Sequence, residues 1–207
     1  LPNLLNSKES FIAADTKGSL RRQVGGSLER RGFRVLELDF TDVLHSPWGY
    51  NPLRYIRWDG DRQCWNEQDI ITVAAVLVPV TSRTDSFWDL SARNYAEALI
   101  GYTLDNLPQE EYTLVSVAKL FAEAETGILD ELMREYCTIC PDSFAAMRWK
   151  FLQGGRKADK TYSSILAILS QRLSNFSFSG VQKMSVNQKQ IDFAEISREP
   201  TAVFVHV

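Results

Sequence analysis

The sequence has few cysteines and no long apolar run, and each shortage excludes a class of protein. Its 207 residues include only three cysteines, too few and too odd in number for a disulfide framework and typical of a reducing compartment. The longest apolar candidate, residues 70–80, is interrupted by Thr72 and Pro79. It falls short of the roughly 18 to 20 residues that cross a bilayer, so we expect no transmembrane helix here.

Metal and nucleotide motifs are scarce as well. Cys137 and Cys140 have the spacing of half a zinc site, but no second pair follows and both histidines, His45 and His206, lie far away in sequence. We therefore expect two buried thiols at the end of a helix. The sequence also lacks a Gly-x-x-x-x-Gly-Lys-Ser/Thr loop and an apolar strand ending in paired acids. A self-contained nucleotide-hydrolysing enzyme is thereby excluded.

The remaining composition is that of an ordinary globular protein. With 44% hydrophobic and 24% charged residues, the chain is long enough to bury a core in one or two domains. The formal net charge of -3 gives no overall basic character, so any surface that binds nucleic acid must be local.

The first forty residues show the pattern of a strand, a helix and a strand. An apolar run over residues 10–14 ends at Asp15, residues 18–31 carry apolar side chains four apart, and residues 33–38 form a second apolar run ending at Asp39. This spacing predicts a βαβ unit whose polar strand ends share one edge, where such sheets place their ligands.

The rest of the chain is predominantly helical in pattern. Residues 40–65 are rich in Pro, Gly and aromatic side chains, which predicts an irregular connector between domains. Helical periodicity or capping signals then recur up to residue 174, and a final apolar run occupies residues 200–207. The helices predicted in this way span residues 66–82, 87–104, 113–121, 127–136, 141–153 and 159–174.

These patterns predict an α/β fold with dominant α, in which a parallel sheet is interrupted by a helical bundle. We assign residues 1–65 to the first part of the sheet domain with its connector, 66–185 to an all-α domain, and 186–207 to the returning strand or strands. The chain begins at Leu1 without Met or a signal sequence, which predicts a segment of a longer polypeptide.

Several short motifs, in this order and spacing, resemble the TraG/TraD-type coupling proteins of conjugation and type IV secretion. The motifs are FIAADTKG (11–18), GFRV (32–35), YNPL (50–53), SFW (86–88) and PTAVF (200–204). One departure is Thr16, where the family usually has Pro. The resemblance covers nearly the whole chain and implies that the sheet is part of a RecA-like nucleotide-binding domain.

The resemblance also implies a function. Family members are membrane-tethered, homohexameric, DNA-pumping ATPases, so the parent protein would use ATP and magnesium, whereas this fragment, which lacks the phosphate loop, would be inactive alone and bind no cofactor. The parent would be anchored at the cytoplasmic face of the membrane, with this fragment soluble and cytoplasmic. Implied partners are a relaxase or other secreted protein, single-stranded DNA and components of the type IV secretion channel.

Two residues at the end of the first predicted strand are candidates for a nucleotide or subunit contact. Asp15 and Lys17 lie at the carboxyl end of a parallel strand, where α/β sheets hold ligands. An Asp just before Gly18 and Ser19 is equally a natural helix cap, and the sequence leaves both interpretations open.

Charge clusters in the helical region indicate possible binding surfaces. Five basic residues alternate with Trp149 and Phe151, a mixture that could follow single-stranded nucleic acid, although it could also be a solvated helix face with a core aromatic. Residues 105–135 carry eight acids against two bases, which suits a basic protein partner or simply solubility. The candidate DNA-binding residues are Arg148, Lys150, Arg156, Lys157 and Lys160, and the candidate partner-binding residues are Glu110 and Glu111.

A different class of protein, a helical adaptor without enzymatic activity, is the alternative hypothesis. Its terminal strands would pair only with each other, and a small sheet with open edges is a liability that larger sheets avoid. We therefore favour the fragment of a motor ATPase.

Overall fold

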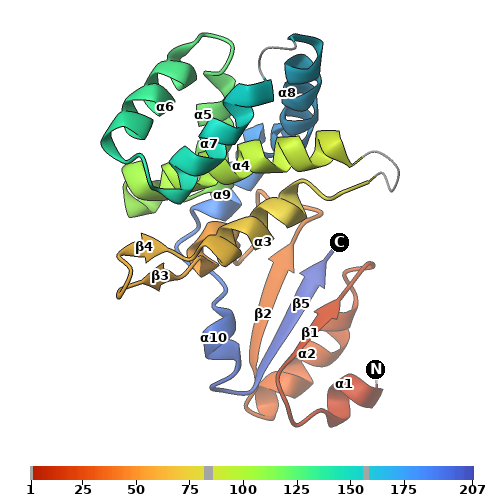
Figure 1. The fold of residues 1–207 in the computed structure, drawn as a ribbon. Coiled ribbons are helices and arrows are strands. Elements are labelled where there is room, and N and C mark those ends of the chain that lie inside the picture. Colours follow the sequence, from red (N-terminus) through yellow and green to blue (C-terminus); the bar gives the residue numbers. More distant parts are fainter. Residues whose placement is uncertain (1, 82–85, 156–158) are drawn as a thin grey trace. The chain divides into compact units, whose positions relative to one another are not determined.

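The computed structural model describes residues 2–81, 86–155 and 159–207, and the chain divides into two compact units. Unit 1 combines residues 1–51 with residues 179–207, and unit 2 comprises residues 52–178. Figure 1 shows that the sheet of unit 1 contains segments from both ends of the sequence.

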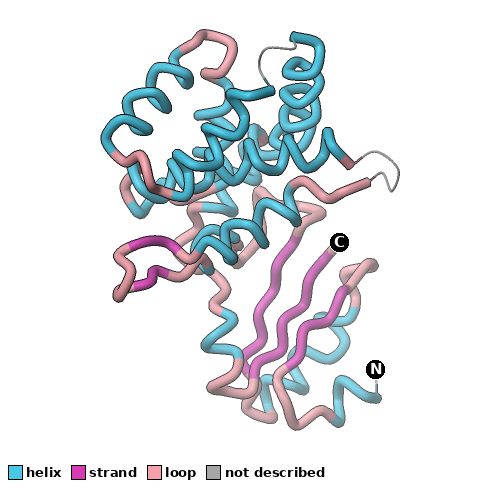
Figure 2. Tube along the Cα trace, in the orientation of Figure 1, coloured by secondary structure: helices cyan, strands magenta, loops and turns pink. Residues whose placement is uncertain are grey.

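Three parallel strands form the sheet of unit 1. They are β1 (Phe11–Ala14), β2 (Arg34–Asp39) and β5 (Thr201–His206), in the order β1-β5-β2. The last strand therefore lies between the first two, and Val203 of β5 is in register with Ile12 on one side and Leu36 on the other. The predicted strand-helix-strand unit exists, but its two strands do not pair directly (Figure 2).

Both faces of the central strand are buried. On one face, α2 (Leu20–Arg30) packs Val24 and Leu28 against Phe204, because these helical residues recur four apart. On the opposite face, Val203 packs with Ile191 and with the apolar side chains of β2. This continuous burial matches the apolar sequence of β5, as expected for a strand inside a parallel sheet.

Three short helices complete unit 1. They are α1 (Pro2–Asn6), α9 (Ser179–Ser185) and α10 (Phe193–Ile196). The last one begins where the Asp192 carboxylate accepts a hydrogen bond from the Ala194 N–H, at 2.8 Å. The return strand is therefore β5 alone, and the polar residues that precede it include a helical turn.

A long helix, α4 (Phe87–Asn106), forms the centre of unit 2. It packs against α3 (Glu67–Leu77), α5 (Leu114–Ala122), α7 (Phe144–Gly155) and α8 (Asp159–Leu173), and α6 (Ile128–Ile139) packs against α7 (Figure 1). The fully buried Tyr95 of α4 meets Trp149 edge-on, with 5.3 Å between ring centroids. Six predicted helices are thus confirmed, although the helix predicted over residues 66–82 ends at Leu77.

Two local predictions are wrong. Residues 40–65 are not wholly irregular, since η1 (Pro52–Tyr55) precedes a hairpin of β3 (Trp58–Asp59) and β4 (Cys64–Trp65), in which Trp58 and Trp65 pair edge-on. Helix α7 begins at Phe144 rather than residue 141, because the Ser143 hydroxyl accepts from the Ala146 N–H at 3.2 Å and caps the helix there.

The predicted fold class, α/β with dominant α and a helical bundle between the parts of a parallel sheet, is confirmed. No helix in the part of the chain that the structure describes is long and apolar enough to cross a membrane.

The buried position of β5 makes a stability prediction. Phe204→Ala should lower the free energy of unfolding by about 3 to 5 kcal/mol, because it leaves a cavity between the sheet and α2. Ile12→Ala on neighbouring β1, whose side chain is 55% exposed, should change it by less than about 1 kcal/mol. Urea unfolding followed by circular dichroism measures both, and equal effects would contradict the buried position of Phe204.

Candidate functional site

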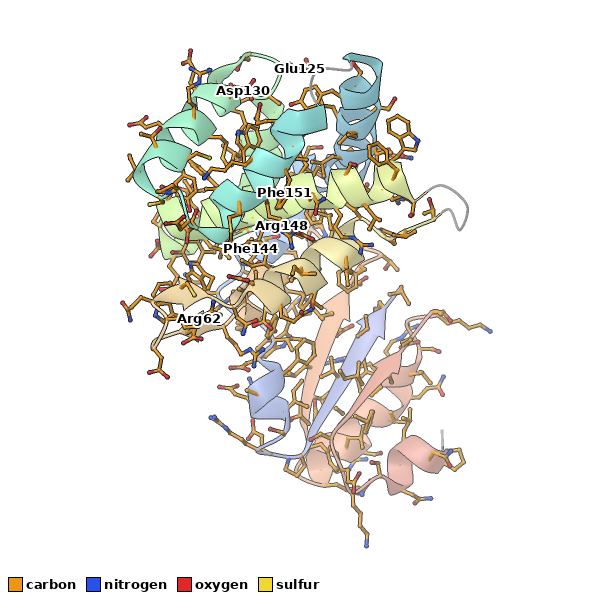
Figure 3. The ribbon with its side chains drawn as sticks, in the orientation of Figure 1. Arg62, Glu125, Asp130, Phe144, Arg148 and Phe151 are labelled. Atoms are coloured by element: carbon orange, nitrogen blue, oxygen red, sulfur yellow. The ribbon has the colours of Figure 1, made fainter. Side chains whose placement is uncertain are left out.

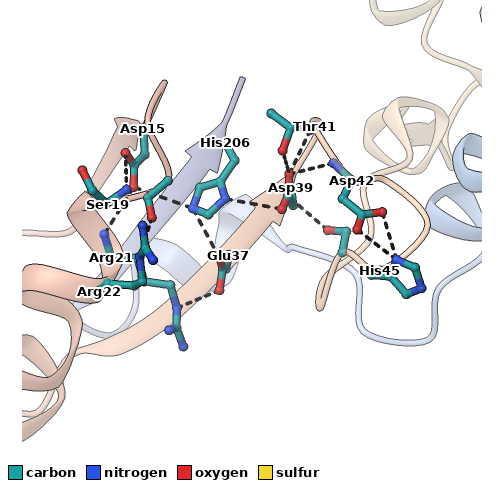
Figure 4. Close-up of polar contacts among 12 residues, drawn as sticks. Asp15, Ser19, Arg21, Arg22, Glu37, Asp39, Thr41, Asp42, His45 and His206 are labelled. Atoms are coloured by element: carbon teal, nitrogen blue, oxygen red, sulfur yellow. Dashed lines mark hydrogen bonds and ion pairs between the residues drawn. The ribbon is translucent and has the colours of Figure 1, made fainter.

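Polar side chains converge at the carboxyl edge of the sheet of unit 1. The three strands end at Ala14, Asp39 and His206, and Asp15 directly follows β1. Figure 4 shows Asp15, Glu37, Asp39 and His206 facing one another across the strand ends. This is the edge at which parallel sheets of α/β proteins hold ligands.

Asp15 caps helix α2. Its carboxylate accepts hydrogen bonds from the backbone N–H groups of Ser19 at 3.0 Å, Leu20 at 2.7 Å and Arg21 at 3.3 Å, and its side chain is buried. Burial alone would raise the pKa of Asp15, but the three backbone bonds outweigh it, with a smaller contribution from His206, and the pKa is lowered. Of the two interpretations that the sequence left open for Asp15, the structure therefore shows the cap of α2 directly.

The imidazole of His206 lies among three carboxylates. Its Nε2 is 3.7 Å from Asp15 and 3.3 Å from Glu37, and its Nδ1 is 3.4 Å from Asp39. Glu37 also forms an ion pair with Arg21 Nε at 2.8 Å. Sequence reasoning missed His206, yet the signal was available, because it occupies the last position of an apolar strand, as Asp39 does.

Asp39 is held by the turn after β2. Its carboxylate accepts bonds from the Thr41 N–H at 2.8 Å, the Thr41 hydroxyl at 2.6 Å and the Asp42 N–H at 2.9 Å. Burial acts to raise the pKa of Asp39, but the hydroxyl and backbone donors prevail and lower it. Both aspartates at this edge are therefore stabilised as anions.

This arrangement favours a cation over a bare phosphate. Three carboxylates lie around His206, and Glu37 is also paired with Arg21, so an anion would meet repulsion unless neighbouring chain supplied donors. The described residues contain no group of three or more His, Cys, Asp or Glu side chains arranged to hold a metal ion. Lys17, the other residue predicted at this edge, is exposed in the turn between β1 and α2.

The candidate DNA-binding residues occupy different environments in unit 2. Arg148 Nε forms an ion pair with the buried Glu97 at 2.7 Å, and its guanidinium lies over the Phe144 ring at 4.9 Å (Figure 3). Lys150 is exposed and donates from Nζ to the Pro141 carbonyl at 2.7 Å. Arg148 is thus held by contacts with Glu97 and Phe144 inside unit 2, whereas Lys150 remains accessible to a ligand.

The aromatic residues beside them divide between core and surface. Trp149 is buried against Tyr95, whereas Phe151 is 71% exposed (Figure 3). Only Phe151 is therefore accessible for stacking with a base. Arg156 and Lys157 lie outside the described residues, as does the side chain of Lys160, so the predicted DNA surface stays a prediction.

The candidate partner-binding acids lie on the surface of unit 2. Glu110 and Glu111 are exposed in the 3-10 turn η2 (Gln109–Glu111), which joins α4 to α5. Farther along the same acidic stretch, Glu125 and Asp130 are labelled in Figure 3. Their role in binding a partner also stays a prediction.

The cysteines do not form the predicted pair of buried thiols. Cys137 is half-buried, because it faces α7, but Cys140 is exposed at the end of α6. Burial raises the pKa of the Cys137 thiol. All three cysteines are free.

A family model described as type IV secretory system conjugative DNA transfer matches residues 1–207. No curated protein matches the chain.

The Asp15 cap predicts a pH dependence. Because folding lowers the pKa of Asp15 below its ordinary value of 3.8, its contribution is fully present above that value and is lost as pH falls through the folded pKa. Asp15→Asn should therefore cost about 1 kcal/mol at pH 7 and progressively less in acid.

Urea unfolding at pH 7 and at successively lower pH values measures this difference. Asp61, an exposed aspartate in the β3–β4 turn, provides the control. Asp61→Asn should change the free energy of unfolding neither at pH 7 nor at the lower pH values. A cost of Asp15→Asn that stayed constant down to pH 2 would contradict the assignment.

Proposed function

This chain belongs to the type IV secretory system family of conjugative DNA transfer, and we propose that it is part of a coupling protein, a DNA-translocating motor ATPase. In this proposal, unit 1 is a portion of a RecA-like nucleotide-binding domain and unit 2 is the helical domain that recruits substrate. The parent protein is a membrane-anchored homohexamer that uses ATP and magnesium.

One observation carries the proposal: unit 2 is inserted between two sequence segments that together form one parallel sheet. A helical adaptor would have no need of such a sheet, whereas a motor domain with an inserted recruiting domain requires this connectivity. The outer position of β1 is further support, since neighbouring polypeptide could extend the sheet at its backbone edge and cover the exposed Ile12 on the sheet face.

The carboxyl edge fits this role as a partner of the nucleotide site rather than as its phosphate cradle. Asp15 and Asp39 are anions at this edge. The phosphates would instead be held by a phosphate-binding loop, which the sequence of this chain lacks. The proposal therefore assigns ATP binding to the assembled parent, with Asp15 and Lys17 near the nucleotide or a subunit contact.

The helical unit is proposed to receive both protein and DNA. Its exposed acids at η2 suit a basic protein such as a relaxase, because complementary charge accelerates and orients encounter. Lys150, Phe151 and the basic residues that follow them in sequence suit a single strand of DNA, through phosphate pairing and stacking.

The protein-recruiting role is tested by charge reversal at η2. Glu110→Lys with Glu111→Lys should lower capture of the cognate relaxase by about tenfold, whereas the same reversal at the exposed Glu9 and Glu29 of unit 1 should not. A pull-down of purified relaxase measures this, and equal capture by all forms would remove the proposed role of η2.

The DNA-binding role is tested separately. Arg156→Glu with Lys157→Glu should weaken binding of labelled single-stranded DNA by about tenfold at low salt, because two phosphate contacts become repulsive. The control, Lys119→Glu with Arg134→Glu, changes the net charge equally at exposed positions of α5 and α6. Fluorescence anisotropy measures both, and equal affinities for both variants would end the assignment.

A further inference from the structure

Unit 2 contains a cavity of about 500 Å³ that the proposed surfaces do not include. Its walls come from the β3–β4 hairpin, the start of α3, the second half of α4 and the junction of α6 with α7. Three aromatic rings and three carboxylates face it, together with a single base. These residues are Trp65, Tyr136, Phe144, Glu67, Asp105, Asp142 and Arg62.

The aromatic walls are fixed by their neighbours. Trp65 donates from Nε1 to the Leu104 carbonyl at 3.1 Å and meets Tyr112 edge-on, with centroids 5.5 Å apart. Tyr136 is buried and meets Tyr102 edge-on at 5.2 Å. Because these rings need not be ordered by a ligand, binding would cost little conformational entropy.

The polar groups of the cavity give it a negative character. The Tyr136 hydroxyl donates to the Asp105 carboxylate, and no other described side chain bonds to that carboxylate. Burial raises the pKa of Asp105 and the Tyr136 bond opposes this rise. Arg62, the only base among the lining residues, is mostly exposed, with its guanidinium 3.9 Å from Glu67. A cation that entered would be attracted to the Asp105 carboxylate, whose residue is exposed to solvent.

Only one kind of ligand would interact favourably with both the aromatic rings and the carboxylates of the cavity. An anion such as a DNA phosphate would be repelled by the carboxylates, and a neutral apolar group would cover them without supplying a cation. A lysine or arginine side chain places its alkyl stem against the rings, its charge near their faces and its donors at the carboxylates.

The charge around the cavity supports the same guest. Asp105 begins the stretch of residues 105–135, whose eight acids and two bases give this part of unit 2 a net negative charge and field. Such a field concentrates basic segments near the surface and orients them before contact. The acidic stretch would thus attract a basic partner, and the cavity would anchor one of its side chains.

We propose that this cavity binds a lysine or arginine side chain from a basic segment of the protein that unit 2 recruits. This inference rests on the protein-recruiting role proposed above and adds to it the chemistry of the recognised segment. Asp105 provides the ion pair, and Trp65 and Phe144 contact the stem of the guest.

A synthetic peptide of alternating arginine and serine, labelled with fluorescein, is the probe. The same peptide with citrulline in place of arginine keeps the shape and removes the charge. We expect the arginine peptide to bind this chain at low salt, and the citrulline peptide to bind at least about tenfold more weakly, as close charge pairs at interfaces do when one charge is lost.

Asp105→Asn and Glu67→Gln, on two different helices, should each weaken arginine-peptide binding by about tenfold. Glu131→Gln removes an exposed charge from the same acidic stretch without touching the cavity, and should weaken it by less than about twofold. Circular dichroism establishes that each variant is folded, and the two cavity variants serve as checks on each other.

The inference is overturned if the arginine peptide does not bind, if citrulline binds equally well, or if Glu131→Gln weakens binding as much as Asp105→Asn. Failure of the underlying function gives a different result. In that case the peptide would bind in a manner dependent on Asp105 while the relaxase is not captured. Capture of the relaxase without any effect of Asp105→Asn would instead leave the recruiting role and reject the cavity.

Discussion

The position of β5 between β1 and β2 is the constraint on which the structure depends. Parallel strands require crossover connections, and here the connection from β2 to β5 contains the whole of unit 2. Strands β1 and β2 therefore belong to one sheet only when residues 201–206 lie between them. Phe204 then packs in the apolar layer on one face of the sheet, and Val203 packs in the apolar layer on the other face.

The same pairing creates the polar edge. Because β5 is parallel to both neighbours, its last residue comes to lie beside the residues that end β1 and β2, and His206 meets Asp15, Glu37 and Asp39. The backbone N–H of Asp15 bonds to the Val205 carbonyl and that of Phe40 to the His206 carbonyl, so the strand ends are fixed as well. This edge joins residues nearly two hundred positions apart in sequence.

Local patterns predicted most of the fold, because periodicity and capping are short-range properties. Helices α2 to α8, both N-terminal strands and the final strand follow from apolar spacing and capping signals. The strand order could not be predicted this way, since pairing between β1 and β5 depends on contacts across the whole chain. The β3–β4 hairpin was missed because its two-residue strands carry no alternation and its stability depends on tertiary contacts such as that of Trp65 with Tyr112.

The candidate sites show the same division. Asp15 could be placed at a strand end from sequence, but whether it capped α2 required the geometry of three N–H groups. The sequence left open whether the basic run at 148–160 was a DNA-binding surface or a solvated face with a core aromatic, and the structure shows that Arg148 turns inward to Glu97 and Trp149 enters the core. Charge counts do not distinguish an exposed side chain from one that compensates a buried opposite charge.

Native-state hydrogen exchange of the intact chain tests the shared sheet most directly. If β5 holds β1 and β2 together, the amides of all three strands should be protected to a similar degree and should open together as denaturant is raised. Exchange of β1 at the rate of an unstructured peptide, while β2 and β5 remain protected, would contradict the joining of both chain ends in one sheet.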